Sequence, residues 1–337
     1  MLTRLRPIGW TCLLLGVLMV ARSFAAEPPH WALAIHGGAG GLPKNLSAAQ
    51  LDAIRAALQS ALDAGSKTLA AGGSSLDAVQ GAVRVMENSG VLNAGRGAVL
   101  DHEGFAELDA ALMDGATRRV GSVAALRHVA NPIDLARQVM EHSSAVLLMG
   151  LGAEEFAKEQ GVGLEPDSYF VTERRRKELE RAIEAEKHPT TRVPTPWHTL
   201  GTVGAVALDV HGNLAAATST GGLTNKHYGR VGDSPIIGAG TYAENGVCAI
   251  SATGAGEYFI RYTAASNVCA RVKYQHVPIA VAARAVLDEM KAAGGEGGLI
   301  GIDRSGTVTM PYSSASMLRG QADASGRHEI VVESARP

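Results

Sequence analysis

The chain has 337 residues, of which 46% are hydrophobic and 19% charged, and 31 Lys and Arg residues stand against 33 Asp and Glu. This balance excludes a disordered chain and a strongly basic nucleic-acid-binding protein, and the length suffices for one large domain or two ordinary ones. Glycine is abundant, with 40 residues and no Gly-X-Y repeat, which predicts many tight turns and close backbone approaches.

The N-terminus has the pattern of a secretory signal peptide. Arginines precede an uncharged apolar run over residues 8–21, which is shorter than the roughly 20 residues of a membrane span. Small residues at Ser23 and Ala25 predict cleavage after Ala25. We therefore expect residues 1–25 to be removed and the protein to be exported, to the periplasm or beyond the cell. A retained membrane anchor is the alternative.

Export bears on the three cysteines, which are too few for a disulfide scaffold. Cys12 leaves with the signal peptide, so that only Cys248 and Cys269 remain in an oxidising compartment. These two either pair or stay buried as thiols, and their spacing does not decide between the two outcomes.

The first half of the mature chain alternates short apolar runs with helical patterns. An apolar run at 31–35 predicts a buried strand that ends in the turn-rich segment 36–41. Apolar residues at helical spacing predict helices at 48–71 and 74–88, followed by a glycine-punctuated loop at 90–97. The remaining elements predicted here are strands at 106–113, 119–125 and 145–149, and helices after Pro132 and at 153–160.

Residues 161–196 differ from the segments on either side. Arginine, lysine and glutamate alternate at short spacing, and several prolines follow. Such mixed-sign charge predicts a solvated helix or a flexible linker rather than a basic patch for nucleic acid. We expect a mobile connector over about residues 161–201, which ends where a strong strand begins.

That strand, at 202–209, and the next one, at 214–219, predict a hairpin. Further predicted elements are strands at 235–240, 246–253, 299–302, 307–311 and 328–333, and helices at 257–271 and 277–292. Strands therefore cluster at both ends of the mature chain with helices between them. This arrangement suits two sheets packed face to face with helices outside.

Three motifs of other enzyme classes are incomplete. The segment His36-Gly37-Gly38 is like the oxyanion loop of esterases, but the chain contains no Gly-x-Ser-x-Gly nucleophile motif. The glycines around Ala239 match a dinucleotide fingerprint only in part, because a turn and no helix follows. Histidines are scattered without His-x-x-x-His or Cys-x-x-Cys spacing, so a catalytic zinc site has no support.

A stronger constellation lies between Gly201 and Glu257. Threonines, serines, glycines, one arginine and one aspartate recur there at predicted strand ends. Ordinary turns use the same residue types, and this is the alternative. The position of Thr202, directly after a linker and at the start of a buried strand, favours a site.

These segments resemble the plant-type L-asparaginase/isoaspartyl aminopeptidase family of N-terminal-nucleophile hydrolases, over essentially the whole mature chain. The matching segments are 36–40, 93–95, 108–110, 113–115, 201–204, 209–222 and 229–235. The resemblance implies an α+β fold, a four-layer αββα sandwich. It also implies that the precursor cuts itself between Gly201 and Thr202. The products would be an α subunit of residues 26–201 and a β subunit of residues 202–337.

The resemblance assigns the catalytic roles by matching position. Thr202 would be the nucleophile, activated by its own freed α-amine, which is a far better base at neutral pH than an amide. Thr220 would contact and support the nucleophile. Thr253 and Gly254 would stabilise the oxyanion, one through its hydroxyl and the other through its backbone N–H. The Gly201 carbonyl belongs to a different reaction, self-cleavage, and we expect it to lie away from these donors.

Substrate binding is implied in the same way. Arg230 matches the residue that holds the substrate α-carboxylate, for which a planar guanidinium is suited. Asp233 matches the acceptor of the α-ammonium group. Gly254 and Gly256 would keep the backbone close to the substrate, and Asn93 would position the region around the nucleophile.

The resemblance implies no cofactor and no metal among the catalytic groups. Main-chain carbonyls in the loop 86–96, from Met86 to Arg96, would hold a structural sodium ion, although Asn88, Ser89, Gly90 and Arg96 depart from the usual residues. The implied partners are small-molecule substrates and a second copy of the chain, in a homodimer of αβ heterodimers. No nucleic acid is implied.

The implied activity is cleavage of L-asparagine to L-aspartate and ammonia, and of β-aspartyl dipeptides, through a β-aspartyl acyl-enzyme. One alternative is glycosylasparaginase, which removes the asparagine-linked sugar amine. That branch has an aspartate directly before its threonine, whereas Gly201 stands there in this chain. A second alternative is an uncleaved, non-catalytic protein that binds β-aspartyl ligands through Arg230 and Asp233.

Overall fold

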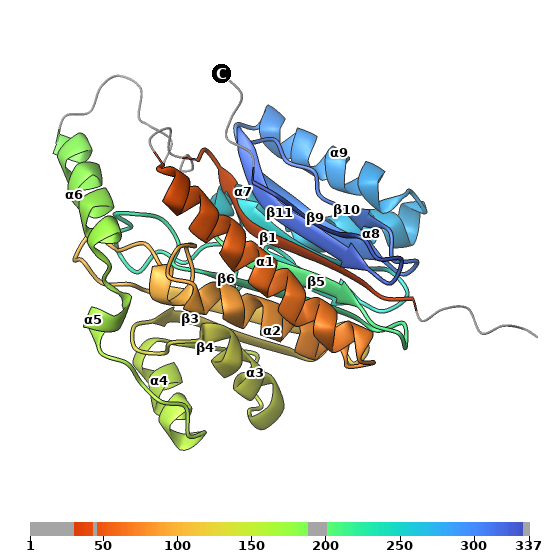
Figure 1. Cartoon of the computed structure of the whole chain (residues 1–337), viewed down its shortest axis with the longest axis horizontal. Helices are drawn as coiled ribbons and strands as arrows, with labels where there is room; N and C mark the ends of the chain where they lie inside the picture. Colours follow the sequence, from red (N-terminus) through yellow and green to blue (C-terminus); the bar gives the residue numbers. More distant parts are fainter. Residues whose placement is uncertain (1–29, 43–45, 188–200, 333–337) are drawn as a thin grey trace, which may run out of the picture.

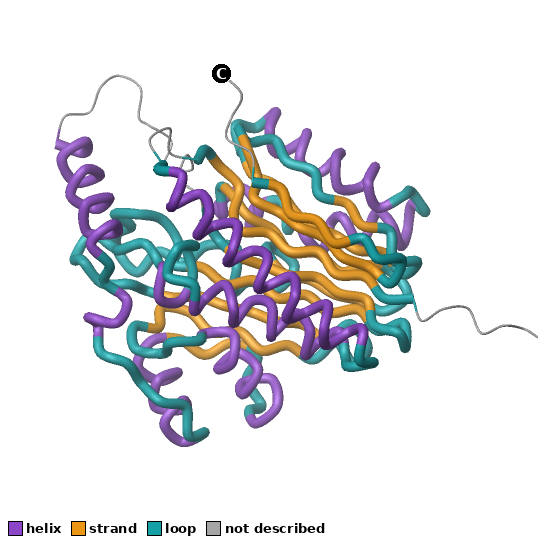
Figure 2. Tube along the Cα trace, in the orientation of Figure 1, coloured by secondary structure: helices purple, strands orange, loops and turns teal. Residues whose placement is uncertain are grey.

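A computed structural model describes residues 30–42, 46–187 and 201–332 (Figure 1). The predicted signal peptide, residues 1–25, lies outside these ranges. Within them the strands gather in the centre and the helices lie on the outside, as Figure 2 shows. No helix of the described residues is long and apolar enough to cross a membrane.

Two sheets form the centre of the molecule. The larger consists, in spatial order, of β12 (His328–Val331), β11 (Ser316–Asp323), β1 (Ala32–Gly40), β5 (Val203–Leu208), β6 (Leu214–Thr220), β2 (Leu108–Asp114), β3 (Val120–Leu126) and β4 (Leu147–Met149). The smaller consists of β10 (Val308–Thr309), β9 (Gly297–Asp303), β8 (Cys248–Gly254) and β7 (Thr241–Glu244). The β3–β4 pair is parallel, and the predicted β5–β6 hairpin is confirmed as an antiparallel pair.

Helices cover the outer face of each sheet. The large sheet is covered by α1 (Ala48–Ala70), α2 (Ser75–Asn88) and α3 (Pro132–His142), and the small sheet by α8 (Ala264–Gln275) and α9 (Ile279–Ala292). One apolar core lies beneath each group of helices, and a third lies between the two sheets. Three cores separate four layers, so the predicted α+β fold, an αββα sandwich, is confirmed.

Local sequence signals start these helices where predicted. Ser47 forms a complete capping box with Gln50 at the start of α1, and the Ser74 side chain accepts a hydrogen bond from the backbone N–H of Asp77 at the start of α2. Pro132 occupies the first turn of α3, where its missing N–H costs nothing. The remaining helical segments are η1 (Gly95–Gly97), α4 (Gly150–Glu159), α5 (Asp167–Phe170), α6 (Glu173–Lys187) and α7 (Gly256–Arg261).

One turn prediction and one strand prediction are wrong. The segment 36–41 is not a turn, because β1 continues through it to Gly40 and pairs with β11 around an irregularity between His36 and Gly38. Residues 235–240 form turns with one isolated bridge, and the strand begins afterwards, at Thr241. Both segments are rich in glycine, and their secondary structure was predicted from composition. Pairing with distant strands decides whether such a segment forms a strand or a turn.

One predicted helix and one missing strand also need correction. The helix predicted at 257–271 is divided into α7 and α8, because Thr263 between them adopts a left-handed backbone conformation with φ of 43°. Strand β11, which pairs with both β1 and β12, was not predicted. Buried and partly buried residues alternate along this strand. The partly buried positions include the polar residues Arg319 and Gln321, so the sequence does not show a continuous apolar run.

The charged segment after α4 contains an ordered helix, α6. Its side chains Arg175 and Leu179 are buried. Arg175 Nε donates a hydrogen bond of 2.7 Å to the carbonyl oxygen of Gly97, and Arg174 donates one of 3.0 Å to that of Val91. The helix therefore packs against the loop 90–97. The charge pattern allowed either a helix or a flexible linker, and residues 173–187 form a helix.

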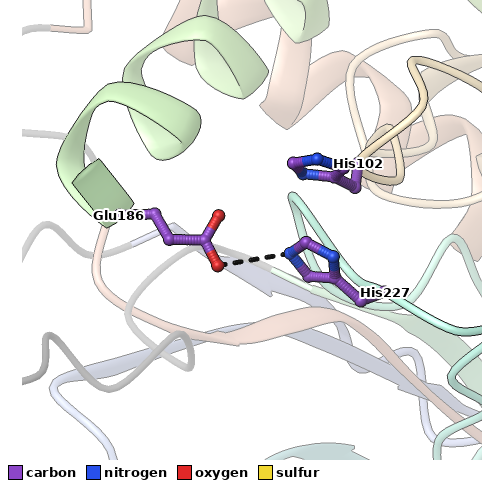
Figure 3. Close-up of side chains that lie close together, drawn as sticks. All are labelled: His102, Glu186 and His227. Atoms are coloured by element: carbon purple, nitrogen blue, oxygen red, sulfur yellow. Dashed lines mark ion pairs between the residues drawn. The ribbon is translucent and has the colours of Figure 1, made fainter.

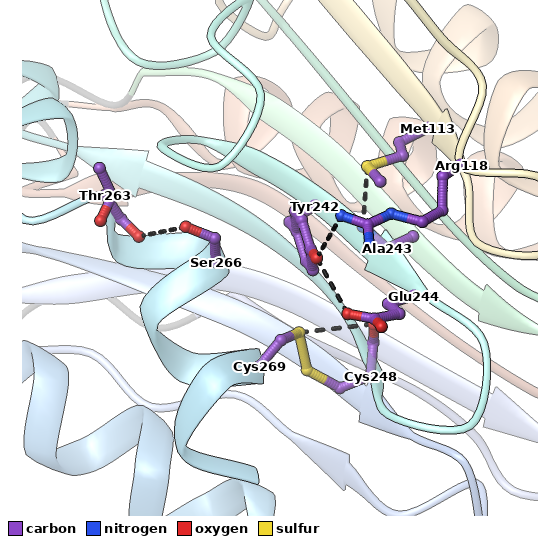
Figure 4. The surroundings of a disulfide bond; sticks show 9 residues. All are labelled: Met113, Arg118, Tyr242, Ala243, Glu244, Cys248, Thr263, Ser266 and Cys269. Atoms are coloured by element: carbon purple, nitrogen blue, oxygen red, sulfur yellow. Dashed lines mark hydrogen bonds between the residues drawn. A yellow bond between two sulfur atoms is a disulfide. The ribbon is translucent and has the colours of Figure 1, made fainter. Parts of the chain in front are cut away.

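Cys248 and Cys269 form a disulfide, which settles the alternative that their spacing left open. The bond joins β8 of the small sheet to α8 above it, as Figure 4 shows. Both residues are buried within the core of this half of the sandwich. The disulfide fixes the layer that carries Thr253 to the helix that covers it.

Candidate active site

Thr202 lies directly before β5, beside the end of the neighbouring strand β6. Its hydroxyl donates a hydrogen bond of 3.1 Å to the hydroxyl oxygen of Thr220, the last residue of β6. The same Thr220 oxygen accepts a hydrogen bond of 3.0 Å from the backbone N–H of Gly222. The hairpin register therefore places the two predicted threonines in contact, and a backbone amide orients the second.

The backbone of Thr202 is strained. Its φ is 62°, in the left-handed region, which is unfavourable for a β-branched residue and costs on the order of 1–3 kcal/mol. The preceding peptide fits tightly against β1, because a Cβ added to Gly38 would lie 2.2 Å from the carbonyl oxygen of Gly201. Tight packing thus holds the bond between Gly201 and Thr202 in a conformation that the chain would otherwise avoid.

Thr253 approaches this bond from the opposite sheet. Its hydroxyl donates a hydrogen bond of 2.9 Å to the carbonyl oxygen of Gly201 and accepts one of 3.0 Å from the backbone N–H of Ala39. The expectation that the Gly201 carbonyl lies away from this donor is therefore wrong. The Ala39 N–H occupies a lone pair of the hydroxyl, so that its proton is directed to the carbonyl at the predicted cut.

Arg230 and Asp233 lie in the same pocket as Thr202, Thr220 and Gly254. Arg230 Nε donates a hydrogen bond of 2.9 Å to Glu257 Oε1, so one edge of the guanidinium is already held. The complete set of pocket residues is Ala39, Gly201, Thr202, Thr220, Gly222, Leu223, Arg230, Gly232, Asp233, Ser234 and Gly254. The pocket therefore joins a hydroxyl cluster to a cation and a carboxyl group.

Two glycines leave space for the charged groups. A Cβ on Gly232 would lie 2.7 Å from Arg230 Nη1. A Cβ on Gly256 would lie 2.8 Å from both Arg230 Nη2 and Asp233 Oδ1. Gly256 is thus required at the junction of the two charged side chains.

Gly254, which also lines the pocket, has a φ of 141° and packs against Gly297. A Cβ added to Gly254 would lie 2.4 Å from the Cα of Gly297, so a side chain there would clash with the backbone.

Asp233 is an unusual carboxyl group. It is 4% exposed, and its Oδ2 atom has no hydrogen-bond partner among the described residues. Burial raises its pKa to about 7, which outweighs the opposing effect of the Arg230 charge. A buried carboxyl group that lines a pocket and lacks a hydrogen-bond partner at one oxygen is suited to receive a cationic group, because an ammonium would supply both a hydrogen bond and a compensating charge.

Asn93 lies behind the pocket rather than in its lining. Its side-chain amide donates a hydrogen bond of 2.9 Å to the carbonyl oxygen of Gly222, and its Oδ1 accepts one of 2.9 Å from the backbone N–H of Val99. It thus fastens the loop after β6, whose Gly222 N–H contacts Thr220. Asn93 therefore positions the hydroxyls of Thr202 and Thr220 indirectly, through Gly222.

A network of hydrogen-bonded polar side chains near Thr202 was not predicted from the sequence. His36 Nε2 is hydrogen-bonded to Ser251 Oγ at 3.0 Å, and Ser251 Oγ lies 2.7 Å from Thr218 Oγ1. Burial lowers the pKa of His36 to about 3, so the imidazole is neutral at neutral pH. Glu257, the partner of Arg230, was also not singled out. These contacts join residues distant in sequence, and no local spacing reports them.

Comparison with known proteins identifies the family. Residues 29–332 match the family described as Asparaginase. The chain is 46% identical to an isoaspartyl peptidase of Salmonella typhimurium, over 85% of this chain and 93% of the relative, and 45% identical to one of Escherichia coli, over 85% and 91%. It is 45% identical to an isoaspartyl peptidase/L-asparaginase of Mus musculus, over 84% and 85%. The chain belongs to the asparaginase family of N-terminal-nucleophile hydrolases.

Proposed function

We propose that the protein is a self-processing threonine hydrolase that converts L-asparagine to L-aspartate and ammonia and cleaves β-aspartyl dipeptides. The single observation that carries this is the geometry at Thr202. Its hydroxyl contacts Thr220, its backbone is strained, and the carbonyl before it is hydrogen-bonded to Thr253. Three elements of two sheets thus converge on one peptide bond.

Self-cleavage begins when Thr202 Oγ attacks the carbonyl carbon of Gly201. Negative charge develops on the carbonyl oxygen, where the Thr253 hydroxyl already donates. The C–N bond then breaks as the proton of the hydroxyl passes to the departing nitrogen, and an ester between Gly201 and the side-chain oxygen of Thr202 is left. Water hydrolyses the ester, which frees the carboxylate of Gly201 and the α-amine of Thr202. Loss of the peptide bond also removes the constraint on φ at Thr202.

The freed amine is then the base for substrate hydrolysis. It takes the proton of the Thr202 hydroxyl as this oxygen attacks the side-chain carbonyl of the substrate. Arg230 binds the α-carboxylate and Asp233 the α-ammonium, which presents that carbonyl to Thr202. Ammonia or an amino acid leaves with a proton from the amine, and water releases aspartate from the acyl-enzyme. Once Gly201 has left, Thr253 can donate to the substrate oxyanion.

The rival activity is removal of a sugar amine from glycosylated asparagine. Gly201 argues against it, as does the agreement with relatives named isoaspartyl peptidase. The decisive assay offers asparagine, a β-aspartyl dipeptide and a glycosylated asparagine to the same preparation. The proposal requires release of ammonia and of the dipeptide's amino acid. Release of the sugar amine alone would overturn it.

The nucleophile is tested by Thr202→Ala. We expect the wild-type preparation to separate into two chains on a denaturing gel and the variant to remain one chain without hydrolytic activity. Thr309→Ala, which changes a threonine of the small sheet outside the pocket, is the matched control and should mature normally. Normal cleavage of Thr202→Ala would assign the nucleophile to another residue. One uncut, inactive chain in the wild type would favour the ligand-binding alternative.

We also propose that the loop 86–96 holds a sodium ion through main-chain carbonyls. The carbonyl oxygens of Gly90 and Leu92 both converge on Gly97, within 3.0 Å and 2.1 Å of an added Cβ. Uncharged oxygen ligands suit a hard cation. Thermal unfolding in sodium chloride should occur at a higher temperature than in choline chloride at equal ionic strength. Equal unfolding temperatures would contradict the proposal.

A second copy of the chain is the proposed partner. Val146, Leu147, Met149 and Leu151 are exposed by 62%, 44%, 60% and 78% around β4, which is the edge strand of the large sheet. An exposed apolar edge of this kind marks an interface. We expect light scattering to give the mass of a dimer of αβ pairs, and Leu151→Glu to weaken it. The control is Val281→Glu on the exposed side of α9, and equal behaviour of both variants would contradict the assignment.

Export is proposed from the N-terminal pattern, and the disulfide between Cys248 and Cys269 supports it because disulfides persist in oxidising compartments. The α chain of protein recovered from the periplasm or medium of a bacterial host should begin at Ala26. Recovery only from the cytoplasm, with residues 1–25 attached, would contradict this proposal.

A further inference from the structure

A cluster of two histidines and one glutamate lies outside the active site, where the end of α6 meets two loops (Figure 3). His102 comes from the loop before β2, Glu186 from the last turn of α6, and His227 from the loop between β6 and Arg230. One ligand atom from each residue lies within 4.8 Å of the others. Because the three residues are far apart in the sequence, no metal-binding motif could reveal them.

The distances suit a small tetrahedral ion. His227 Nε2 and Glu186 Oε1 are 3.3 Å apart. Two ligand atoms at roughly 2.0–2.1 Å from a tetrahedral zinc ion are separated by about 3.3 Å. The rings of His102 and His227 are stacked with centroids 4.2 Å apart, and one nitrogen of each ring lies within 4.8 Å of a carboxylate oxygen of Glu186. His227 Nε2 is also buried without a hydrogen-bond partner among the described residues.

Asn225 orients two of the three side chains. Its Nδ2 donates a hydrogen bond of 2.9 Å to Glu186 Oε2, which leaves Oε1 directed to His227. Its Oδ1 lies 2.8 Å from His102 Nδ1, and since an amide oxygen only accepts, this ring nitrogen carries the proton. The other nitrogen of His102, Nε2, then has a free lone pair. Outer partners of this kind are typical of metal sites.

We propose that His102, Glu186 and His227 bind a zinc ion, with water completing the coordination. Two imidazoles and one carboxylate are a ligand set that zinc takes in proteins. The ion would lie beside the substrate pocket rather than within it, since none of the three residues lines the pocket. Its role is therefore structural.

The site links segments that self-cleavage separates. On the proposed function, His102 and Glu186 belong to the α chain and His227 to the β chain, so the ion bridges the two chains. The His227 carbonyl accepts a hydrogen bond of 3.1 Å from the backbone N–H of Arg230. The His102 N–H donates one of 2.9 Å to the carbonyl of Lys226. The ion would thus hold the loop that leads to the substrate-binding arginine.

Calorimetric titration of zinc chloride into chelator-treated protein without a histidine tag tests the site. We expect one zinc ion per αβ pair, and at least a 100-fold loss of affinity in His102→Gln and in His227→Gln. His211→Gln changes an exposed histidine in the β5–β6 turn and is the matched control, which should bind as the wild type does. Absence of zinc binding, or equal affinity in all three variants, would overturn the proposal.

Two further measurements separate zinc binding from other roles of these residues. Asn225→Ala keeps all three ligands but should weaken zinc about 10- to 100-fold. Hydrogen exchange of residues 181–187 should slow on adding zinc to the wild type and not to His227→Gln. Thr202→Ala, which stays uncut, should still bind zinc, so that failure of the self-cleavage proposal leaves this result unchanged. Loss of zinc in Thr202→Ala, or exchange that zinc does not slow, would contradict a site formed as described.

Discussion

In the proposed mechanism, the hydroxyl of Thr253 donates to two carbonyl groups in succession, first that of Gly201 and then that of the substrate. Thr253→Val removes the donor at nearly constant volume, and loss of one such donor typically costs about 10²–10³ in rate. We therefore expect slow maturation of the precursor as well as slow turnover. A time course on denaturing gels checks this, with Thr309→Val as the control. Full-speed maturation would show that the bond of 2.9 Å to Gly201 has no part in cleavage.

The guanidinium group of Arg230 is held at its Nε atom by a hydrogen bond to Glu257. Arg230→Lys keeps the charge but loses the paired donors, and one hydrogen bond to a charged group contributes about 1.5–3 kcal/mol. The KM for asparagine should rise roughly 10- to 100-fold, while kcat falls less, because the reacting carbonyl is bound elsewhere. Steady-state kinetics of both enzymes measures this change, and an unchanged KM would show that Arg230 does not bind the substrate.

Asp233 makes stability depend on pH. Its pKa is 3.8 in the unfolded reference and about 7 when folded, so the folded state holds its proton more tightly. Stability from this group is present at low pH and is lost as pH rises through about 7. Asp233→Asn cannot ionise, so its unfolding temperature should gain on the wild type between pH 3.8 and about 7. Asp288→Asn, on the exposed side of α9, is the control substitution. Parallel curves of unfolding temperature against pH for Asp233→Asn and the wild type would contradict the raised pKa of Asp233.

At the scale of elements, α6 clamps the loop 90–97 that carries Asn93. Arg175 is 4% exposed, and burial lowers its pKa to about 10, so it remains charged at neutral pH. Arg175→Met leaves the carbonyl of Gly97 without its donor and should cost about 1–3 kcal/mol of stability. Arg176→Met, on the same helix with its side chain 60% exposed, should cost far less. Chemical unfolding of both variants is the measurement, and equal losses would mean that α6 does not clamp the loop.

The sequence predicted best the elements whose signals are local. Helices α1, α2 and α3 begin at a capping serine or a proline and were placed almost to the residue. The extension of β1 to Gly40, the strand β11 and the break at Thr263 depend on pairing or packing with distant segments, and local patterns do not contain that information. α6 was ambiguous for the same reason, since the partner of Arg175 lies in another loop.

At the scale of the molecule, the candidate site spans both sheets. Thr202 and Thr220 come from the large sheet and Thr253 from the small one, so the site exists only when the sandwich is closed. The family resemblance assigned these residues individually. It did not show that Thr253 contacts Gly201 before cleavage, nor that Asp233 has an unsatisfied oxygen, because both facts arise from how the layers meet.

On the proposed function, Thr202 becomes an active nucleophile by becoming a chain terminus. The most direct measurement follows freshly synthesised protein over time, with intact mass and N-terminal sequencing for the cut and aspartate release from a β-aspartyl dipeptide for activity. We predict that a new terminus at Thr202 and hydrolytic activity appear with the same time constant. Full activity in an uncut chain, or a cut at any other bond, would contradict the account.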